Sequence, residues 1–364
     1  MAPNYCFVAE KSVISILSSL YGLEVESISN IGSYFNVNYL VKTRLSRKIQ
    51  PDQIKYIVKI INTNSDSFFD NIDLQQHLME HLKMNDVGCP VPLKTIKGNA
   101  FVKGHGEDSC YLLQLLSFLP GQSITSVSAS VEDLNEIFYN VGIHMARFHQ
   151  ASKTLKFDCS SMSSNFLFRP ENAFQICGKI DYVSDKRVKR SIEKHMESFR
   201  RNFLPRVHEL RKGFIHGDFS ESNVIVKKRN PGPKSAQENL WHVTGIIDFE
   251  HCHYGYIIGE LGISIAYHMT KSVSTPASDI ITSTRHIING YQSMNPLTLV
   301  EKELLFDAVV SRLGVSYVSG CYNSSLYPEK KDLFMMQSKH IPQILDILDK
   351  MEKKKIISMW FENE

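Results

Sequence analysis

Two short segments of the chain, FIHGDFSESNVIV at 214–226 and VTGIIDFE at 243–250, carry Asp218, Asn223 and Asp248. Asn223 directly precedes one apolar run, and Asp248 directly follows another. If these runs pair as an antiparallel hairpin, Asn223 and Asp248 emerge side by side at one end. Asp218 lies five residues before Asn223, on the loop that enters the first strand. The spacing therefore predicts a cluster of two carboxylates and an amide.

Such a cluster suits the transfer of a phosphoryl group from a nucleoside triphosphate to a hydroxyl. Mg²⁺ on the phosphates prefers oxygen ligands, and the attacking hydroxyl needs a proton acceptor. The order matches the H-R-D-x-x-x-x-N and D-F-G motifs of kinases. Asp218 is therefore the predicted proton acceptor, and Asn223 and Asp248 are the predicted metal ligands. For either segment alone, an equal alternative is that the Asp and Asn side chains only accept hydrogen bonds from backbone amides of a turn. The two segments together favour catalysis.

A lysine in an apolar strand is the next candidate. Lys59 lies within YIVKII at 56–61, where an unpaired cation would be costly. A kinase amino lobe carries its phosphate-binding lysine on the third strand and pairs it with an acid on the next helix. That helix is predicted at 67–84, with Asp73 as the partner and Glu80 as the competing choice. The alternative is a lysine that extends to solvent from an edge strand.

The apolar run at 111–118 ends at Leu119-Pro120-Gly121, where the chain must turn. In a kinase with two lobes this is the position of the hinge. The backbone of Phe118 and Leu119 is therefore predicted to contact the nucleotide base. The alternative is an ordinary exit from a strand into a loop.

Strand patterns dominate the first part of the chain and helical patterns dominate the rest. The predicted strands lie at 25–31, 36–43, 56–61 and 111–118. The predicted helices lie at 131–150, 186–211 and 257–269, followed by three more. This pattern predicts an α+β, bilobal, protein-kinase-like fold. Residues 1–118 would form a β-rich N-terminal lobe that binds nucleotide, and residues 119–364 a mostly helical C-terminal lobe for catalysis and substrate binding.

Composition agrees with a soluble enzyme, and the cysteines favour the cytoplasm. The chain of 364 residues, 43% of them hydrophobic, can bury a sizeable core, and its net charge of +3 gives no reason to expect a nucleic-acid or membrane partner. Seven cysteines without a C-x-x-C pair predict reduced thiols. A zinc site at His251-Cys252-His253 is disfavoured because no second ligand pair accompanies it. The first helical pattern is amphipathic, unlike a signal peptide, and no stretch is predicted to span a bilayer.

HGDFSESN, followed by IDFE and by Glu260 twelve residues after Asp248, resembles the aminoglycoside phosphotransferase superfamily, which includes choline and homoserine kinases. The resemblance extends from Glu24 to the C-terminus and implies a fold similar to that of protein kinases. It implies that Glu260, where the family usually has Asp, orients the catalytic loop. It also implies that the segment containing Ser33 and Asn38 covers the nucleotide phosphates.

Within that superfamily the chain most resembles hydroxylysine kinases. Besides HGDFSESN, the segments that carry this resemblance are VKI at 58–60, LLSFLPG at 115–121, GIIDF at 245–249, YGY at 254–256, LTLVEK at 297–302 and LYPEKKD at 326–332. The resemblance implies a cytoplasmic enzyme that phosphorylates the side-chain hydroxyl of 5-hydroxylysine with GTP as donor. The residues themselves leave ATP open as the donor, and choline-, ethanolamine- or homoserine-like molecules open as the acceptor.

A peptide acceptor is disfavoured. Gly217 replaces the arginine of H-R-D, and the run between Asp248 and the next predicted helix is too short for the activation segment on which a peptide docks. An amino-acid acceptor needs a carboxylate for its ammonium group and a guanidinium for its carboxylate. Glu250 and Arg312 are the predicted partners. His216 is predicted to position the loop and not to act on the substrate.

A function without turnover is the second hypothesis. A nucleotide-binding regulatory module would account for the atypical loop at 33–38 and for the Asp, in place of the usual Glu, at position 73. It predicts that nucleotide stabilises the protein against heat while no amine yields product. The kinase hypothesis instead predicts turnover that depends on Mg²⁺ and on Asp218.

Overall fold

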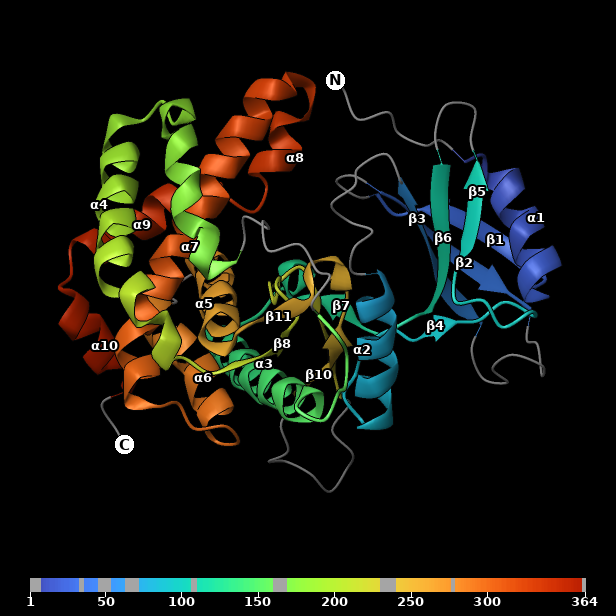
Figure 1. The fold of residues 1–364 in the computed structure, drawn as a ribbon, viewed down its shortest axis with the longest axis horizontal. Coiled ribbons are helices and arrows are strands. Elements are labelled where there is room, and N and C mark those ends of the chain that lie inside the picture. Colours follow the sequence, from blue (N-terminus) through green and yellow to red (C-terminus); the bar gives the residue numbers. More distant parts are fainter. Residues whose placement is uncertain are drawn as a thin grey trace. The chain divides into compact units, whose positions relative to one another are not determined.

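The computed structural model describes residues 8–32, 36–44, 54–62, 72–105, 110–159, 169–229, 240–275 and 279–361. The chain divides into two compact units (Figure 1). Unit 1 comprises Met1–Met84 and Cys89–Leu119, and unit 2 comprises Asn85–Gly88 and Pro120–Glu364. Ser33, which was predicted to contact nucleotide, lies outside the described residues.

Unit 1 is built on an antiparallel sheet of six strands, in the order β1-β2-β3-β6-β4, with β5 also paired to β6. The strands are β1 (Val25–Asn30), β2 (Val37–Thr43), β3 (Lys55–Asn62), β4 (Pro92–Leu93), β5 (Val102–His105) and β6 (Cys110–Ser117). Helix α1 (Glu10–Tyr21) precedes the sheet, and α2 (Ile72–Met84) follows β3. The four strands predicted for this part of the chain are confirmed.

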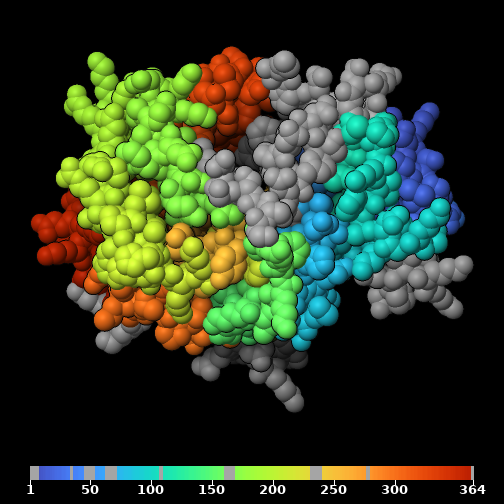
Figure 2. All heavy atoms as spheres, viewed as in Figure 1, coloured from blue at the N-terminus to red at the C-terminus, as the bar shows by residue number. Residues whose placement is uncertain are grey.

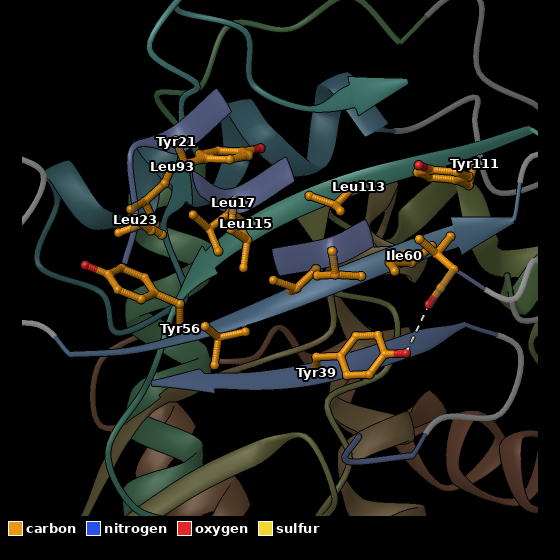
Figure 3. Packing of buried hydrophobic residues seen from close by; sticks show 14 residues of the cluster. Leu17, Tyr21, Leu23, Tyr39, Tyr56, Ile60, Leu93, Tyr111, Leu113 and Leu115 are labelled. Carbon is orange, nitrogen blue, oxygen red and sulfur yellow. Dashed lines mark hydrogen bonds between the residues drawn. The ribbon is translucent and has the colours of Figure 1, made fainter. Parts of the chain in front are cut away.

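The two faces of β3 have different neighbours, because side chains alternate along a strand. Tyr56, Val58 and Ile60 belong to a buried core cluster that also contains Leu17 of α1 (Figure 3). Lys59 must therefore project from the opposite face of the sheet. One face of β3 therefore packs against the core cluster, and the other face carries Lys59.

Features of both helices of unit 1 can be explained from their sequences. α1 ends at Gly22, whose φ of 66° lies in the left-handed region that glycine adopts without cost. α2 buries Leu74, Leu78 and Leu82, the stripe predicted from helical periodicity.

Unit 2 is mostly helical. Its helices are α3 (Val131–Ser152), α4 (Lys186–Asn202), α5 (Ile257–Val273), α6 (Ile280–Gln292), α7 (Leu299–Leu326), α8 (Lys331–Met335), α9 (Ile341–Asp349) and α10 (Lys353–Phe361). Its strands are β7 (Gln122–Ser123), β8 (Lys212–Ile215), β9 (Val224–Lys228), β10 (Trp241–Ile246) and β11 (His253–Tyr256). Its 3₁₀ helices are η2 (Ile124–Ser126), η3 (Pro170–Tyr182), η4 (Leu204–Glu209), η5 (Phe249–His251) and η6 (Pro328–Lys330). α4 lies at the surface of this unit (Figures 1 and 2).

Two sequence predictions for unit 2 are corrected by the structure. The single helix predicted at 186–211 ends at Asn202 and gives way to η4, because Pro205 has no N–H to donate to a further helical turn. After α5, the described residues form five α-helices instead of the three predicted.

α7 is long and largely apolar. Among the described residues, it is the one helix that could cross a membrane by length and composition alone. However, 83% of its most apolar stretch is buried inside the structure. A helix that is apolar on most sides is typical of the interior of a protein of this size. α7 is therefore a core helix of unit 2.

α3 and α6 approach closely at two glycines, which gives a test of the packing. A Cβ at Gly142 would lie 2.1 Å from the carbonyl oxygen of Ile287, and a Cβ at Gly290 would lie 2.0 Å from that of Tyr139. We expect Gly142→Ala to destabilise the protein by about 2 kcal/mol, because a backbone oxygen cannot move unless the helices separate. The measurement is urea unfolding. Gly178→Ala, which meets nothing within 4 Å, is the control, and equal stability of the two variants would contradict the expectation.

Candidate active site

The predicted hairpin forms, and it brings Asn223 and Asp248 to the same end. β9 and β10 pair antiparallel with Val224 opposite Ile246, and the N–H of Ile247 donates to the carbonyl of Asn223 at 2.9 Å. Asp248 follows in a left-handed conformation, with φ 70° and ψ 68°. Residues other than glycine rarely adopt this conformation, and those that do cluster at functional sites. The two predicted metal ligands are therefore neighbours in space.

Glu260 on α5 holds the loop that carries Asp218. Its buried carboxylate accepts hydrogen bonds from the backbone N–H of His216 and, at 3.1 Å, from that of Gly217. Burial acts to raise the pKa of Glu260, but nearby His149, with Nε2 at 3.9 Å, and His216 hold the pKa below its ordinary value. The carboxylate is therefore ionised, as an acceptor of two N–H groups should be. Glu260 stands at the place from which the family resemblance implies that it orients the loop.

The His216 ring joins the two segments of the site. Its Nε2 lies 3.1 Å from the carbonyl oxygen of Ile247, and its Nδ1 accepts from the N–H of Asp218 at 3.3 Å. This pattern assigns the ring proton to Nε2. The ring also meets Phe249 edge-on, with centroids 4.8 Å apart, and burial lowers the pKa of the imidazole. Because both ring nitrogens have protein partners, this geometry supports a positioning role.

Gly217 is required by the turn between His216 and Asp218. Its φ is +81°, and a Cβ there would lie 2.2 Å from the carbonyl oxygen of His251. We expect Gly217→Ala to destabilise the protein by about 3 kcal/mol and to lower activity, because the loop must shift to relieve the contact. Thermal unfolding and turnover check this. Gly32→Ala is the control, since Gly32 has a φ of +73° but nothing within 4 Å. An effect no larger than the control's would count against the contact.

Asp218 is held from two sides by protein donors. Asn223 Nδ2 donates to its Oδ2 at 2.8 Å and to its backbone oxygen at 3.0 Å, and Arg312 Nη2 donates to its Oδ1 at 3.2 Å. Burial raises the pKa of Asp218, and the charge of Arg312 is the main opposing influence. A carboxylate in this setting is more basic than one in water, while its remaining lone pairs stay available to a donor.

The side chains at the hairpin mouth fit a divalent metal ion. Because the amide nitrogen of Asn223 points to Asp218, its oxygen is the atom left to face a cation. Asp248 is exposed, so its carboxylate can be reached from solution. A neutral amide oxygen and a carboxylate are ligands that Mg²⁺ accepts, with water and phosphate oxygens completing the octahedron.

Two buried residues near Asp218 were missed from the sequence. Tyr267 on α5 accepts at its hydroxyl from Arg312 Nη2 at 2.9 Å. The signal was its position seven residues after Glu260, which places both on one face of a helix. Glu221 lies inside HGDFSESN itself and accepts from Thr270 Oγ1 at 2.9 Å, and burial raises its pKa to about 7.

In unit 1, Lys59 is 8% exposed and lies directly opposite Asn38 on β2 and Gln114 on β6. Residues directly opposite on neighbouring strands share a face of the sheet. The predicted nucleotide-binding residues Asn38 and Lys59 therefore lie side by side, with Gln114 as an unpredicted neighbour. Phe118 and Leu119 directly follow β6 at the last residues of unit 1.

The predicted ion pair between Lys59 and Asp73 is not formed among the described residues. Asp73 is exposed on the first turn of α2, because the helix turns its leucine stripe toward the interior. The competing candidate, Glu80, pairs instead with Lys94 at 3.3 Å. The polar side chains that α2 buries are Gln75 and Gln76.

Residues 28–297, well over half of the chain, match the phosphotransferase enzyme family. The chain belongs to that family. The relation predicted from HGDFSESN and IDFE is thereby confirmed, and the chain is a small-molecule phosphotransferase with an alcohol acceptor. Family membership favours turnover over a regulatory module.

The relatives found among curated proteins are hydroxylysine kinases. That of Mus musculus is 28% identical over 366 residues, which cover 97% of this chain and 92% of the relative. That of Xenopus laevis is 28% identical over 364 residues, which cover 98% of this chain and 93% of the relative. The similarity therefore extends over both units.

Solved structures with the same fold are also kinases. An amicoumacin kinase in complex with AMP-PNP and Ca²⁺ matches with a TM-score of 0.65 and 18% identity, over 92% of this chain and 93% of that one. A microcompartment-associated aminopropanol kinase matches with a TM-score of 0.62 and 13% identity, over 94% of this chain and 98% of that one. A choline kinase from Cryptosporidium parvum matches with a TM-score of 0.56 and 12% identity, over 94% and 97%. The predicted kinase-like α+β fold is confirmed.

Proposed function

We propose that this phosphotransferase transfers the γ-phosphate of GTP to the side-chain hydroxyl of 5-hydroxy-L-lysine. The observation that carries the catalytic part is Asp218, held by Asn223 and Arg312 beside the mouth of the hairpin that bears Asp248. Similarity over nearly the whole chain to hydroxylysine kinases supports the choice of acceptor. Seven scattered cysteines without a C-x-x-C pair, which favour reduced thiols, support a cytoplasmic location.

Asp218 accepts the proton of the acceptor hydroxyl as that oxygen attacks the γ-phosphorus, while the bond from the γ-phosphorus to the β–γ bridging oxygen breaks and GDP leaves. Glu260 and His216 keep the loop in place, so the carboxylate is aimed before the substrate arrives. The Oδ1 of Asn223 and the carboxylate of Asp248 would hold Mg²⁺. When bound, that ion would supply positive charge to the negatively charged phosphate oxygens.

Unit 1 would hold the nucleotide. Lys59 places a cation on the sheet face that also carries Asn38, where it can bind phosphate oxygens. The backbone of Phe118 and Leu119, at the end of β6, would bind the base. On the acceptor side, half-buried Glu250, two residues after Asp248, would pair with an ammonium group of the amino acid.

The test is a panel of hydroxylated amines with Mg²⁺ and either GTP or ATP, scored for nucleoside diphosphate release and for the phosphorylated product. The panel contains 5-hydroxylysine, choline, ethanolamine, homoserine and 1-aminopropan-2-ol. We expect 5-hydroxylysine with GTP to react with the highest kcat/KM. If another amine reacts while 5-hydroxylysine is inert with both donors, the acceptor assignment fails and the phosphotransferase activity stands. Preference for ATP would overturn the donor assignment alone.

A further inference from the structure

Arg312 lies in the middle of α7 with only 6% of its side chain exposed. Its Nη2 donates both to Asp218 Oδ1 at 3.2 Å and to the Tyr267 hydroxyl at 2.9 Å. Its guanidinium carbon also lies 5.0 Å from the centroid of the Tyr267 ring. The Tyr267 hydroxyl is fixed in turn by Ser316 Oγ at 2.8 Å, one turn along α7. The guanidinium is therefore held by α5 and by the catalytic loop.

The burial of the Arg312 guanidinium bears on which carboxylate it binds. The guanidinium is almost fully enclosed, and its Nη2 is shared between the Asp218 carboxylate and the Tyr267 phenol. Breaking a buried ion pair leaves a charge uncompensated, which is strongly unfavourable. The contacts of Nη2 therefore favour a lasting partnership of Arg312 with Asp218.

The two donors to Asp218 come from different parts of unit 2. Asn223, on the same loop, binds Oδ2, and Arg312, from a core helix, binds Oδ1. One donor alone would let the carboxylate rotate about its Cβ–Cγ bond, but donors to both oxygens fix its plane. A fixed plane determines the direction in which the remaining lone pairs point.

We propose that Arg312 is a positioning residue that fixes the carboxylate plane of Asp218, and that Tyr267 orients Arg312 for this task. The inference rests on the proposed role of Asp218 as proton acceptor. It replaces the sequence-based expectation that Arg312 binds the carboxylate of the acceptor. The two roles differ in their kinetic consequences, because a positioning residue acts on the chemical step for any acceptor, whereas a carboxylate-binding residue acts only on acceptors that have a carboxylate.

The experiment compares Arg312→Gln, Arg312→Lys and Tyr267→Phe with two acceptors, 5-hydroxylysine and 1,5-diaminopentan-2-ol, which lacks the carboxylate. Arg312→Gln is expected to lower kcat about 100-fold for both acceptors, as misaimed catalytic groups do, with acceptor KM changed by less than about 3-fold. Arg312→Lys is expected to restore about one tenth of wild-type kcat, because an ammonium keeps the charge but not the fork geometry. Tyr267→Phe is expected to lower kcat about 5-fold, because one orienting hydrogen bond is lost.

Arg201→Gln, at a side chain that is 69% exposed and pairs with Glu197, is the matched control and should leave both constants unchanged. The inference is overturned if Arg312→Gln raises KM for 5-hydroxylysine more than about 10-fold with kcat retained, while the analogue without a carboxylate is unaffected. If Arg312→Gln does not fold, the inference is judged on Arg312→Lys and Tyr267→Phe. Lowered kcat for both acceptors would support it, and unchanged kcat in both variants would overturn it. If no amine in the panel reacts with wild-type protein, the proposed function fails. The same variants are then compared in the slow hydrolysis of GTP by water, where an unchanged rate would overturn the inference.

Discussion

Replacing Asp218 with asparagine is expected to lower kcat about 1,000-fold while the nucleotide KM changes little, because the amide cannot accept the proton of the attacking hydroxyl. The substitution keeps the size of the side chain and an oxygen for Arg312, which donates to Asp218 Oδ1 at 3.2 Å. It therefore removes the chemistry without removing the packing. The measurement is steady-state turnover with the best acceptor of the panel.

The matched control for this variant is Asp181→Asn. Asp181 pairs with Lys189 at the surface, and its side chain is 92% exposed, so its loss should leave kcat unchanged. His216→Gln should lower kcat less than Asp218→Asn, because His216 acts on the loop and not on the substrate. Equal losses from these two substitutions would contradict the division of roles, and undiminished turnover of Asp218→Asn would remove Asp218 as the proton acceptor.

The second large effect is expected at Asp248. Asp248→Asn should lower kcat/KM about 100-fold and raise the Mg²⁺ concentration needed for half-maximal activity, because one charged ligand of the metal is lost. Asparagine tolerates the left-handed backbone that Asp248 adopts, with φ 70°. The loss therefore reflects the missing charge and not backbone strain.

Asp248→Ala provides the contrast, because alanine pays a steric cost in the left-handed region. It should lower the unfolding temperature as well as the activity, whereas Asp248→Asn should lower the activity alone. Asp346→Asn, at a side chain 63% exposed, is the control for removing a carboxylate. A Mg²⁺ titration of Asp248→Asn that superimposes on that of the wild type would show that Asp248 is not a metal ligand.

Much of the framework could be predicted from local patterns. The pairing of β9 and β10 followed from two apolar runs, next to Asn223 and Asp248, separated by a polar turn, and the two strands pair as predicted. The left-handed closure of α1 followed from Gly22. Helix ends were predicted less well. The helix predicted at 186–211 ends at Asn202, and η4, which contains Pro205, replaces its last turns.

Pairings between distant residues were predicted least well. The acid expected to meet Lys59 was chosen by residue type, yet Asp73 is exposed and Glu80 pairs with Lys94. Which side chain of a helix faces a sheet depends on the rotation of the whole helix, and that rotation is set by the packing of its apolar stripe. A charged residue near the right place in sequence can therefore face solvent.

Short-range rules were enough to predict from the sequence that Asp218, Asn223 and Asp248 lie together, because a single hairpin and its entering loop bring them to one place. The contacts that support this cluster come from distant helices, and for Glu260 the sequence offered a family resemblance but no local pattern. Glu260 reaches the loop from α5, and Arg312 reaches Asp218 from α7, 94 residues away in the chain. Such contacts depend on how core helices pack around a buried polar cluster, and no local pattern in the chain specifies that packing.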